Sequence, residues 1–414
     1  MFTYTTLKKT DKEVAKAVQG ELKRQEEGLE MIASENYASS AVIEALGTVF
    51  TNKYSEGYPG KRYYGGQTYT DIVETLALHR AQKLFGAEHA NVQPLSGAAA
   101  NIAAYMAVLE PGDTILGMDL SHGGHLTHGH PVTYMSKIYN FVRYTTEADG
   151  SIDYNKLEAL AKEVKPKLLL AGFSSYTRQL DYAKFAAIGK KVKAITMMDM
   201  AHIAGLVAGK ALPNPVEYFD IVTTTTHKTL RGPRGGMILC RQKFAEAIDK
   251  AVFPGFQGGP HMNIIAAKAV SFQEALQKTF KSYAKQTLNN AKTLENELRK
   301  RGYEIVFGGT ENHMLVVDVF ATLGIGGKEA QHILDEIGIS VNKNMIPDDV
   351  RSPFDPSGIR IGVPAITTRG MKEKQVKLIA GWIDESLRGR ESKKLLKDIQ
   401  KEVKALCKEF PLYA

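Results

Sequence analysis

The sequence has little cysteine and no long apolar run, and each absence excludes a class of protein. Its two cysteines, Cys240 and Cys407, form no CxxC pair, so a disulfide scaffold is excluded and both are expected to be reduced thiols. Apolar runs such as 167–173 fall far short of the ~20 residues that cross a bilayer. The first residues carry charges but no apolar stretch behind them, unlike a secretory signal. We therefore expect a cytoplasmic protein that does not associate with a membrane.

The remaining composition is that of an ordinary globular protein. Of the 414 residues, 43% are hydrophobic and 24% are charged, and no internal repeat, low-complexity segment or Pro/Ser-rich linker is visible. The net charge is +8, and half of the excess falls in residues 371–414. Charges of both signs occur there at helical spacing, which is typical of a solvated helix face. A nucleic-acid partner is therefore not expected.

The order of the predicted elements indicates an α/β fold. After a polar amphipathic helix at 11–30, residues 32–69 show little periodicity and are predicted to form a long functional loop. From about residue 70, short apolar strands alternate with helical patterns, which predicts a mainly parallel sheet covered by helices on both faces. The predicted strands are 114–118, 167–173, 194–199, 220–225 and 236–240, and the predicted helices are 70–86, 98–109, 154–164 and 181–192.

A second, smaller α/β domain is predicted after a long helical pattern at 262–300. Strands at 314–319 and 359–362 alternate there with helices at 327–337, 370–388 and 391–408. We predict an N-terminal helical arm at 1–30, a large domain at 31–280 and a small C-terminal domain at 281–414, with the long helix near residue 280 as the join.

Lys228 is the strongest local indication of chemistry. It follows the β-branched run 223–226 and precedes a Gly/Pro turn, which places a lysine at the carboxyl end of a strand. Open parallel sheets bind their ligands at those ends. A second cation nearby, such as Arg234 or His227, would lower the pKa of the lysine enough for its amine to form a Schiff base. Taken alone, the residue could also be a surface lysine after a strand.

Asp199 ends the strand that precedes the one before Lys228, and His202 lies three residues further on. A carboxylate there could accept a hydrogen bond from a protonated pyridine nitrogen and keep that ring an electron sink. An aspartate that only caps the next helix is equally compatible with this position. Two strands that end in Asp and in Lys together favour pyridoxal phosphate.

Two glycine-containing turns could bind the phosphate of such a cofactor. Ser96, Gly97 and Ala98 precede a helix, where free N–H groups and the serine hydroxyl can hold a dianion. The turn 254–260 contains the pair Gly258 and Gly259, which could add further N–H donors.

An amino-acid substrate also needs a partner for its carboxylate and groups that move protons. Arg360 lies on a short apolar strand, and its guanidinium fork matches a carboxylate; an ion pair with a protein acid is the alternative. The loop 54–66 combines phenols with one acid, Glu56, which could transfer protons. Tyr/Gly loops are also common as interface surface, and the spacing does not separate the two interpretations.

Four histidines within 122–130 invite a zinc-site interpretation. No paired cysteine or HExxH helix accompanies them. The glycines between them would instead allow one imidazole to stack on a planar cofactor. We therefore predict no metal.

Assembled in order, these stretches closely resemble serine hydroxymethyltransferase, a pyridoxal-phosphate enzyme of the aspartate aminotransferase fold type, fold type I. The resemblance runs from about Arg24 to the C-terminus. It implies an α/β fold, with a mainly parallel seven-stranded sheet flanked by helices in the large domain and a smaller C-terminal α/β domain. Its specific stretches are 29–36, 52–66, 122–129, 199–206, 223–236 and 357–370.

The resemblance also implies a role for each matching residue. Lys228 would hold pyridoxal 5'-phosphate in a Schiff base, Asp199 would pair with the pyridine nitrogen, His202 would lie near the 3'-oxygen, and His125 would stack on the ring. Further residues implied around the cofactor are Ser96, Gly97, Ala98, Ser174, Tyr54, Gly258 and Gly259. Residues implied in catalysis are Lys228, Glu56, His227, Tyr64 and Thr225.

Substrate contacts follow from the same resemblance. Arg360, helped by Ser34, would bind the amino-acid carboxylate, and Glu56 and Tyr64 would lie near the reacting group. The implied folate contacts are Leu120, Gly124, Leu126, Asn344, Ser352, Pro353 and Phe354. In the family, Tyr54, Glu56, Tyr64 and the paired glycines reach across an interface, which implies a homodimer with shared active sites.

The implied activity is the reversible interconversion of serine and glycine. Tetrahydrofolate would accept the one-carbon unit as 5,10-methylenetetrahydrofolate, and slower folate-independent cleavage of β-hydroxy amino acids would accompany it. Departures from the family pattern are Gln67, Ala99 and Thr177, none of which removes a catalytic group. A modified pterin in place of tetrahydrofolate, and a tetramer in place of a dimer, stay open.

Two alternatives explain less of the sequence. A threonine aldolase, also a pyridoxal-phosphate enzyme, would need no pterin contacts at 120–126 and 352–354. An RNA-binding or metal-buffering protein would not explain Lys228, Asp199 and Arg360 together.

Overall fold

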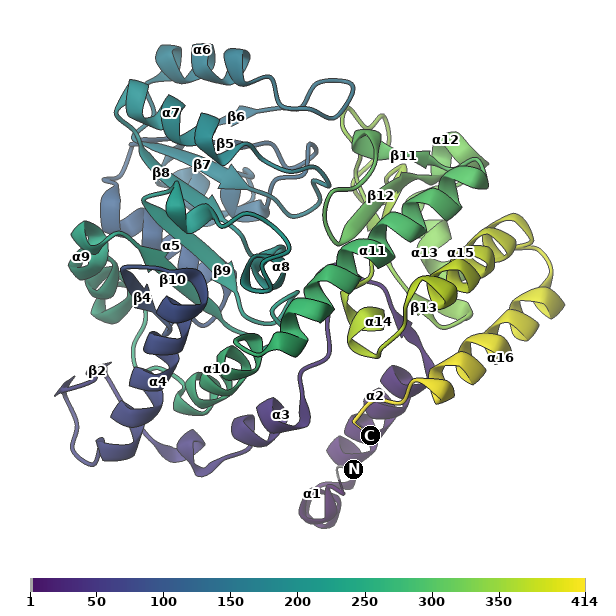
Figure 1. Ribbon diagram of the computed structural model, residues 1–414, viewed down its shortest axis with the longest axis horizontal. Helices are drawn as coiled ribbons and strands as arrows, with labels where there is room; N and C mark the ends of the chain where they lie inside the picture. Colours follow the sequence, from purple (N-terminus) through teal and green to yellow (C-terminus); the bar gives the residue numbers. More distant parts are fainter. Residues whose placement is uncertain (1–2, 414) are drawn as a thin grey trace.

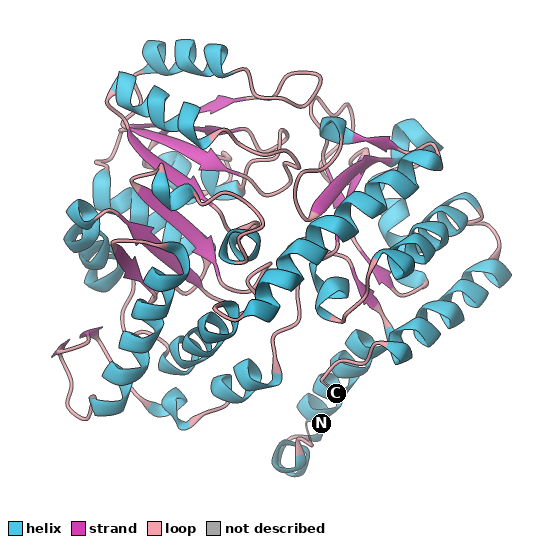
Figure 2. Cartoon of the chain, viewed as in Figure 1, coloured by secondary structure: helices cyan, strands magenta, loops and turns pink. Residues whose placement is uncertain are grey.

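A seven-stranded sheet and a four-stranded sheet lie on the left and right of Figure 1, and the long helix α11 (Lys278–Lys300) runs diagonally between them. The computed structural model describes residues 3–413. In that part of the chain, no helix has the length and apolar character needed to cross a membrane. Figure 2 shows helices on both faces of the larger sheet.

The larger sheet has the strand order β4-β10-β9-β8-β7-β5-β6. Only β10 runs antiparallel to its neighbours, so the predicted mainly parallel seven-stranded sheet is confirmed. Its strands are β4 (His89–Asn91), β5 (Thr114–Met118), β6 (Asn140–Tyr144), β7 (Leu168–Gly172), β8 (Ile195–Asp199), β9 (Ile221–Thr225) and β10 (Gly236–Cys240). The sequence analysis missed β4 and β6.

Two separate cores cover the two faces of this sheet, because successive side chains of a strand point to opposite faces. Met197 belongs to the core under α5, whereas Met198 belongs to the core under α4, α8 and α10. The covering helices are α4 (Thr68–Phe85), α5 (Gly97–Val108), α6 (Tyr154–Val164), α7 (Tyr182–Val192), α8 (Ala204–Ala208), α9 (Ala245–Lys250) and α10 (Met262–Ala275).

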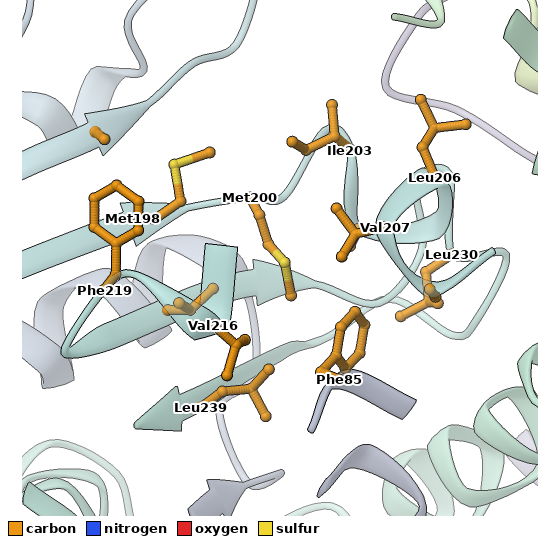
Figure 3. Close-up of a cluster of buried hydrophobic side chains, with 14 of the residues drawn as sticks. Phe85, Met198, Met200, Ile203, Leu206, Val207, Val216, Phe219, Leu230 and Leu239 are labelled. Atoms are coloured by element: carbon orange, nitrogen blue, oxygen red, sulfur yellow. The ribbon is translucent and has the colours of Figure 1, made fainter. Parts of the chain in front are cut away.

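The core beneath the end of β8 is shown in Figure 3. Met198 and Met200 flank Asp199 and are fully buried together with Phe85 and Leu206. Since Asp199 alternates with these methionines along the chain, its side chain points to the opposite face, toward α5, where it meets Asn101. The apolar residues thereby fix the direction of the carboxylate.

The smaller sheet is antiparallel and has the order β11-β12-β15-β14. Its strands are β11 (Glu304–Ile305), β12 (Met314–Asp318), β14 (Asn342–Asn344) and β15 (Gly358–Gly362), and the surrounding helices are α12 (Val319–Leu323), α13 (Gly327–Glu336), α14 (Pro364–Thr368), α15 (Glu373–Arg388) and α16 (Lys393–Glu409). The first part of the chain joins this unit: α2 (Lys12–Glu27) lies beside α16, and β1 (Leu29–Glu30) pairs with β13 (Ile339–Ser340) (Figure 1).

The predicted boundary near residue 280 falls inside α11. Phe280 and Ala284 of this helix pack in the core of the larger sheet, whereas Leu294 and Leu298 pack in the core of the smaller one. One rigid helix therefore belongs to both units. The division into 1–30, 31–280 and 281–414 stays a prediction.

Two predicted segments differ from the structure. The helix predicted at 262–300 is broken between α10 and α11, where Gln277 has extended backbone; no proline or glycine marks this break. The segment 32–69 contains a capped helix and a hairpin, so its prediction as a structureless loop is wrong. Its elements are α3 (Ser40–Leu46), η1 (Val49–Asn52), β2 (Gly57–Tyr58) and β3 (Lys61–Arg62).

The remaining short elements are α1 (Thr5–Thr10), η2 (Leu126–His128), η3 (Tyr134–Lys137), η4 (Pro215–Glu217), η5 (Gln242–Phe244), η6 (Ala251–Phe256) and η7 (Val306–Gly308).

Replacing Phe85, the last residue of α4, should strongly destabilise the larger unit. The side chain is fully buried in the core of Figure 3, and a buried Phe→Ala change costs about 3–5 kcal/mol through lost burial and a cavity. We expect Phe85→Ala to lower the midpoint of urea unfolding followed by circular dichroism. Val132→Ala, at a side chain that is 76% exposed, is the control and should change the free energy of unfolding by less than about 0.5 kcal/mol. Equal midpoints for the two variants would contradict this packing.

Candidate active site

A cavity of about 220 Å³ lies at the carboxyl ends of β8 and β9, beside the N-terminus of α5. This is the edge of a parallel sheet where ligands bind. It brings together eight of the predicted site residues. They are Ser96, Gly97, Ala98, His125, Asp199, Thr225, His227 and Lys228, and Phe173, Ala201 and Arg234 complete the lining.

Lys228 lies three residues beyond β9 and is only 8% exposed. Within residues 3–413, its Nζ atom forms no hydrogen bond and no ion pair. Burial lowers the pKa of Lys228 from 10.5 to about 8, and the positive charges of Arg360 and Arg234 add to this effect against the opposing charge of Asp199. Because the ammonium is poorly stabilised, a substantial fraction of Lys228 is a neutral, nucleophilic amine at mildly alkaline pH.

Asp199 is held as an anion. Although burial alone would raise its pKa, hydrogen bonds from His128 and Asn101 keep the pKa well below its ordinary value. The carboxylate accepts from Asn101 Nδ2 at 2.8 Å, from the Ala201 N–H at 3.0 Å and from His128 Nε2 at 3.2 Å. Thr223 Oγ1 in turn donates to Asn101 Oδ1. A buried carboxylate of this kind can stabilise a protonated ring nitrogen.

The start of α5 forms a cup for an anion. Ser96 caps the helix and accepts from the Ala99 N–H at 3.1 Å, while the first N–H groups of a helix have no partner within it. A Cβ on Gly97 would lie 2.7 Å from Cγ2 of Thr225, and a Cβ on Gly236 would collide with the Ser96 carbonyl. Only glycine therefore allows β9 and β10 to approach this turn so closely.

Lys268 supports the same turn from behind, and the sequence analysis missed it. Its buried ammonium donates to the carbonyls of Val92, Pro94 and Gly236 at 2.6, 3.0 and 2.8 Å. These carbonyls flank the turn that begins at Ser96 and the start of β10. The three carbonyls match the three hydrogens of an ammonium, whereas burial lowers the pKa of Lys268 to about 7.

The two histidines that line the cavity, His125 and His227, are neutral at pH 7. Burial lowers the pKa of His125 to about 4, and neighbouring His128 contributes. Burial and the charge of Arg234 lower the pKa of His227 to about 3. Neutral imidazoles can lie against a planar ring without bringing a charge into the cavity.

Arg360 reaches this region from β15 of the smaller sheet and is buried. Its Nε donates to Asn342 Oδ1 at 3.0 Å and its Nη1 to the Ser174 carbonyl at 2.7 Å. No acid among residues 3–413 pairs with this guanidinium. The structure therefore contradicts the alternative that Arg360 forms an ion pair with a protein acid. Burial lowers the pKa of Arg360 only to about 10, and the group remains a cation whose Nη2 is free of described partners. Ser34 belongs to the segment that bonds β15 through the Met31 carbonyl and the Gly362 N–H at 2.7 Å.

Residues predicted to contact folate lie in two loops that approach each other. Leu120, Gly124 and Leu126 follow β5, whereas Asn344 lies on β14 and 352–354 form an exposed turn after it. His122 Nε2 lies 3.9 Å from Asp348 Oδ1, which marks the point of approach. Leu126 and Phe354, 45% and 81% exposed, present apolar surface there.

The remaining predicted residues form a separate group outside the Lys228 cavity. Tyr54 and Tyr64 contact edge to face at 5.1 Å between ring centroids, and a hydrogen bond with Glu56 raises the pKa of Tyr54. Cβ atoms on Gly258 and Gly259 would lie 3.6 Å from Glu56 Oε1 and 3.2 Å from the Tyr54 ring. This group surrounds the β2–β3 hairpin, which projects at the lower left of Figure 1.

Comparison with known proteins gives one consistent result. The family model for serine hydroxymethyltransferase matches residues 7–383. Curated proteins of that name from Acidobacterium capsulatum and Koribacter versatilis are each 56% identical to the chain over 409 residues, which cover 99% of the chain and 96% of each relative. The chain belongs to the serine hydroxymethyltransferase family. This membership confirms the predicted family, fold type and enzyme class.

Several residues that organise this serine hydroxymethyltransferase-family site were not singled out from the sequence. Asn101 and His128 orient Asp199, Asn342 holds Arg360, and His313 contacts His202. Asn101 stands in the same small-residue stretch as Ser96, and His128 in the histidine cluster, so both were visible as candidates. Nothing in the sequence indicates that Asn342 and His313 face the site.

The histidine cluster contributes a group that could hold a metal ion: ligand atoms of His125, His128 and Asp199 lie within 4.8 Å of one another. His128 and Asp199 are hydrogen bonded to each other within that group. The absence of a metal stays a prediction.

The pKa of Lys228 sets the pH at which the amine can react. Since only the neutral form attacks an aldehyde, the rate at which apoenzyme captures the predicted cofactor, pyridoxal 5'-phosphate, should rise with pH and level off above about pH 8. Stopped-flow absorbance between about pH 6 and pH 10 measures this rate. Lys228→Ala, the control, should show no capture. A rate that keeps rising toward the ordinary lysine value of 10.5 would contradict the buried environment.

Proposed function

We propose that this enzyme interconverts serine and glycine at the Lys228 cavity, with tetrahydrofolate as the one-carbon acceptor and 5,10-methylenetetrahydrofolate as the product. Family membership confirms this activity and its cofactor, pyridoxal 5'-phosphate. The observation that supports the site best is a cavity lined by a lysine of lowered pKa and a buried anion, with the charge of an arginine that no described acid neutralises acting on that lysine. A threonine aldolase without folate use is not better supported.

The residues present fit the cofactor. Lys228 offers the amine, Asp199 an anion for the pyridine nitrogen, the start of α5 a cup for the phosphate, and His125 a neutral ring that could stack. Ser174, which contacts Arg360, would face a cofactor oxygen. When bound, pyridoxal 5'-phosphate supplies an electron sink for the bond between Cα and Cβ of serine.

The chain's own residues then bind and orient the substrate. Arg360 presents its free Nη2 to the carboxylate, and Ser34 would assist from the neighbouring segment. Fixing the carboxylate at one point would limit the orientations that the substrate can take in the cavity. Thr225, whose Oγ1 donates to the Ala201 carbonyl at 3.3 Å, and neutral His227 would bound the other side of the cavity.

The active site is completed by a second copy of the chain. Asp199 is the only carboxylate that lines the Lys228 cavity among the described residues, and it is held as a permanent anion. A proton-transfer acid is therefore missing within the protomer. Glu56 is available on a projecting hairpin, beside the exposed rings of Tyr54 and Tyr64. We propose a homodimer in which Glu56, Tyr64, Tyr54, Gly258 and Gly259 enter the partner's site.

The hairpin is well anchored for this role. Arg62 is almost completely buried and donates to the carbonyls of Ser55 and Gly57, each at 2.9 Å. It also pairs with Asp71 and with the buried carboxylate of Glu74. These contacts on both sides of Glu56 hold its backbone in one conformation.

The pterin would lie where the two folate loops approach each other. Exposed apolar side chains and an amide are combined there, from Leu120, Gly124 and Leu126 on one side and from Asn344, Ser352, Pro353 and Phe354 on the other.

We also propose that the enzyme acts in the cytoplasm, as the sequence predicts.

Replacing the guanidinium of Arg360 should weaken amino-acid recognition. Purified enzyme supplied with serine should form glycine and 5,10-methylenetetrahydrofolate in equal amounts, measured by chromatography, and only when tetrahydrofolate is present. Arg360→Lys loses the planar fork and should raise the KM for serine about a hundredfold, while pyridoxal 5'-phosphate still binds. Threonine cleavage that is faster than serine turnover and indifferent to folate would instead identify an aldolase.

Heterodimers test the shared active site. Lys228→Ala and Glu56→Gln chains each lack one half of a site. They are co-expressed with different affinity tags, and the heterodimer is purified with both tags in tandem. A heterodimer contains one intact site of two and should recover about half of the unmodified activity, whereas each homodimer is inactive. Lys228→Ala chains carrying both tags are the matched control. Inactive heterodimers would place Lys228 and Glu56 in the same protomer's site.

A further inference from the structure

His202 and His313 form a buried imidazole pair beside the active-site cavity. His202 follows Ala201, which lines the cavity, and His313 directly precedes β12. Nδ1 of His202 lies 3.4 Å from Nε2 of His313. The rings are nearly parallel, at 24°, with centroids 5.5 Å apart. Because the nitrogens are closer than the centroids, they face each other across the pair.

The backbone decides which nitrogen of this pair carries the proton. Nε2 of His313 also lies 3.2 Å from the Ala33 carbonyl, and a carbonyl can only accept a hydrogen bond. Nε2 of His313 must therefore carry a hydrogen, which it shares between Ala33 and His202. Nδ1 of His202 is then the acceptor, which leaves the hydrogen of a neutral His202 on Nε2.

Both rings are neutral, so this assignment holds at physiological pH. Burial and the charges of Lys228 and Arg360 lower the pKa of His202 well below its ordinary value. Burial and Arg360 lower the pKa of His313 to about 3.

The resulting donor on His202 is buried and unused. Nε2 of His202 has no hydrogen-bond partner among residues 3–413, and an unpaired buried donor destabilises the folded protein. The backbone of His202 is held next to it, since the His202 carbonyl accepts from Thr229 Oγ1 at 2.8 Å. A hydrogen-bond acceptor on a ligand would satisfy this N–H.

We propose that His313 is a positioning residue that fixes His202 as the Nε2–H tautomer and so presents one N–H donor to an acceptor oxygen of the bound cofactor. The inference deepens the proposed function and depends on it for the identity of the ligand. His313 also connects two parts of the site. Ala33, whose carbonyl it contacts, precedes Ser34. The His313 carbonyl accepts at 3.1 Å from the N–H of Val363, three residues after Arg360. The segments proposed to bind the substrate thus determine which ring nitrogen of His202 carries the hydrogen.

Neutron diffraction of the unmodified apoenzyme tests the tautomer without any cofactor. The expected result is deuterium on Nε2 of both His202 and His313, with none on Nδ1 of His202. Deuterium on Nδ1 of His202 would overturn the proposal, whatever the ligand of the site proves to be.

Variants test the consequence for the cofactor. His313→Phe keeps a planar ring but no donor, and should weaken pyridoxal 5'-phosphate binding about tenfold and shift the absorption spectrum of the bound cofactor. His313→Gln, whose amide can donate to both Ala33 and His202, should restore both properties. His332→Phe on α13 is the control for a histidine outside the site. Unchanged affinity and spectrum in a folded His313→Phe enzyme would overturn the role of His313, whereas failure of the unmodified enzyme to bind the cofactor would overturn the proposed function instead.

Discussion

A lysine, an arginine and an anionic aspartate buried close together are the constraint on which this structure depends. Lys228 and Arg360 are removed from water with no acid paired to either among the described residues, and Asp199 is satisfied by His128 and Asn101 rather than by the cations. Burying charge without a partner is costly. In the proposed function, ligands would provide the missing groups: the aldehyde of the cofactor would react with the Lys228 amine, and the carboxylate of the substrate would neutralise Arg360.

The scaffold explains how these groups meet although they are far apart in the sequence. Asp199 and Lys228 follow adjacent parallel strands, so they lie at one edge of the sheet. Arg360 arrives from a different sheet, across an interface that α11 spans with residues in both cores. The proposed substrate contact at Arg360 and the proposed cofactor contact at Lys228 therefore belong to different structural units. Their relative position depends on α11 and on contacts between the two units, among them Arg360 with Ser174 and His313 with His202.

Features carried by local pattern were predictable from the sequence. The strand at 114–118 and the helix at 154–164 have the predicted bounds, and Asp199 and Lys228 were placed at strand ends by their apolar runs alone. Features that depend on tertiary contact were not predictable. The break at Gln277 has no glycine or proline, β14 is a polar strand recognisable only by its pairing with β15, and Asn342 and His313 act through residues distant in the sequence.

The central claim is that cofactor, amino acid and pterin bind next to one another at one active site. The visible absorption spectrum of the purified holoenzyme tests it most directly, recorded with glycine before and after tetrahydrofolate is added. The account predicts a yellow protein whose spectrum gains an intense band at longer wavelength only when glycine and tetrahydrofolate are both present. A protein that stays colourless after incubation with pyridoxal 5'-phosphate, or a spectrum indifferent to the folate, would contradict it.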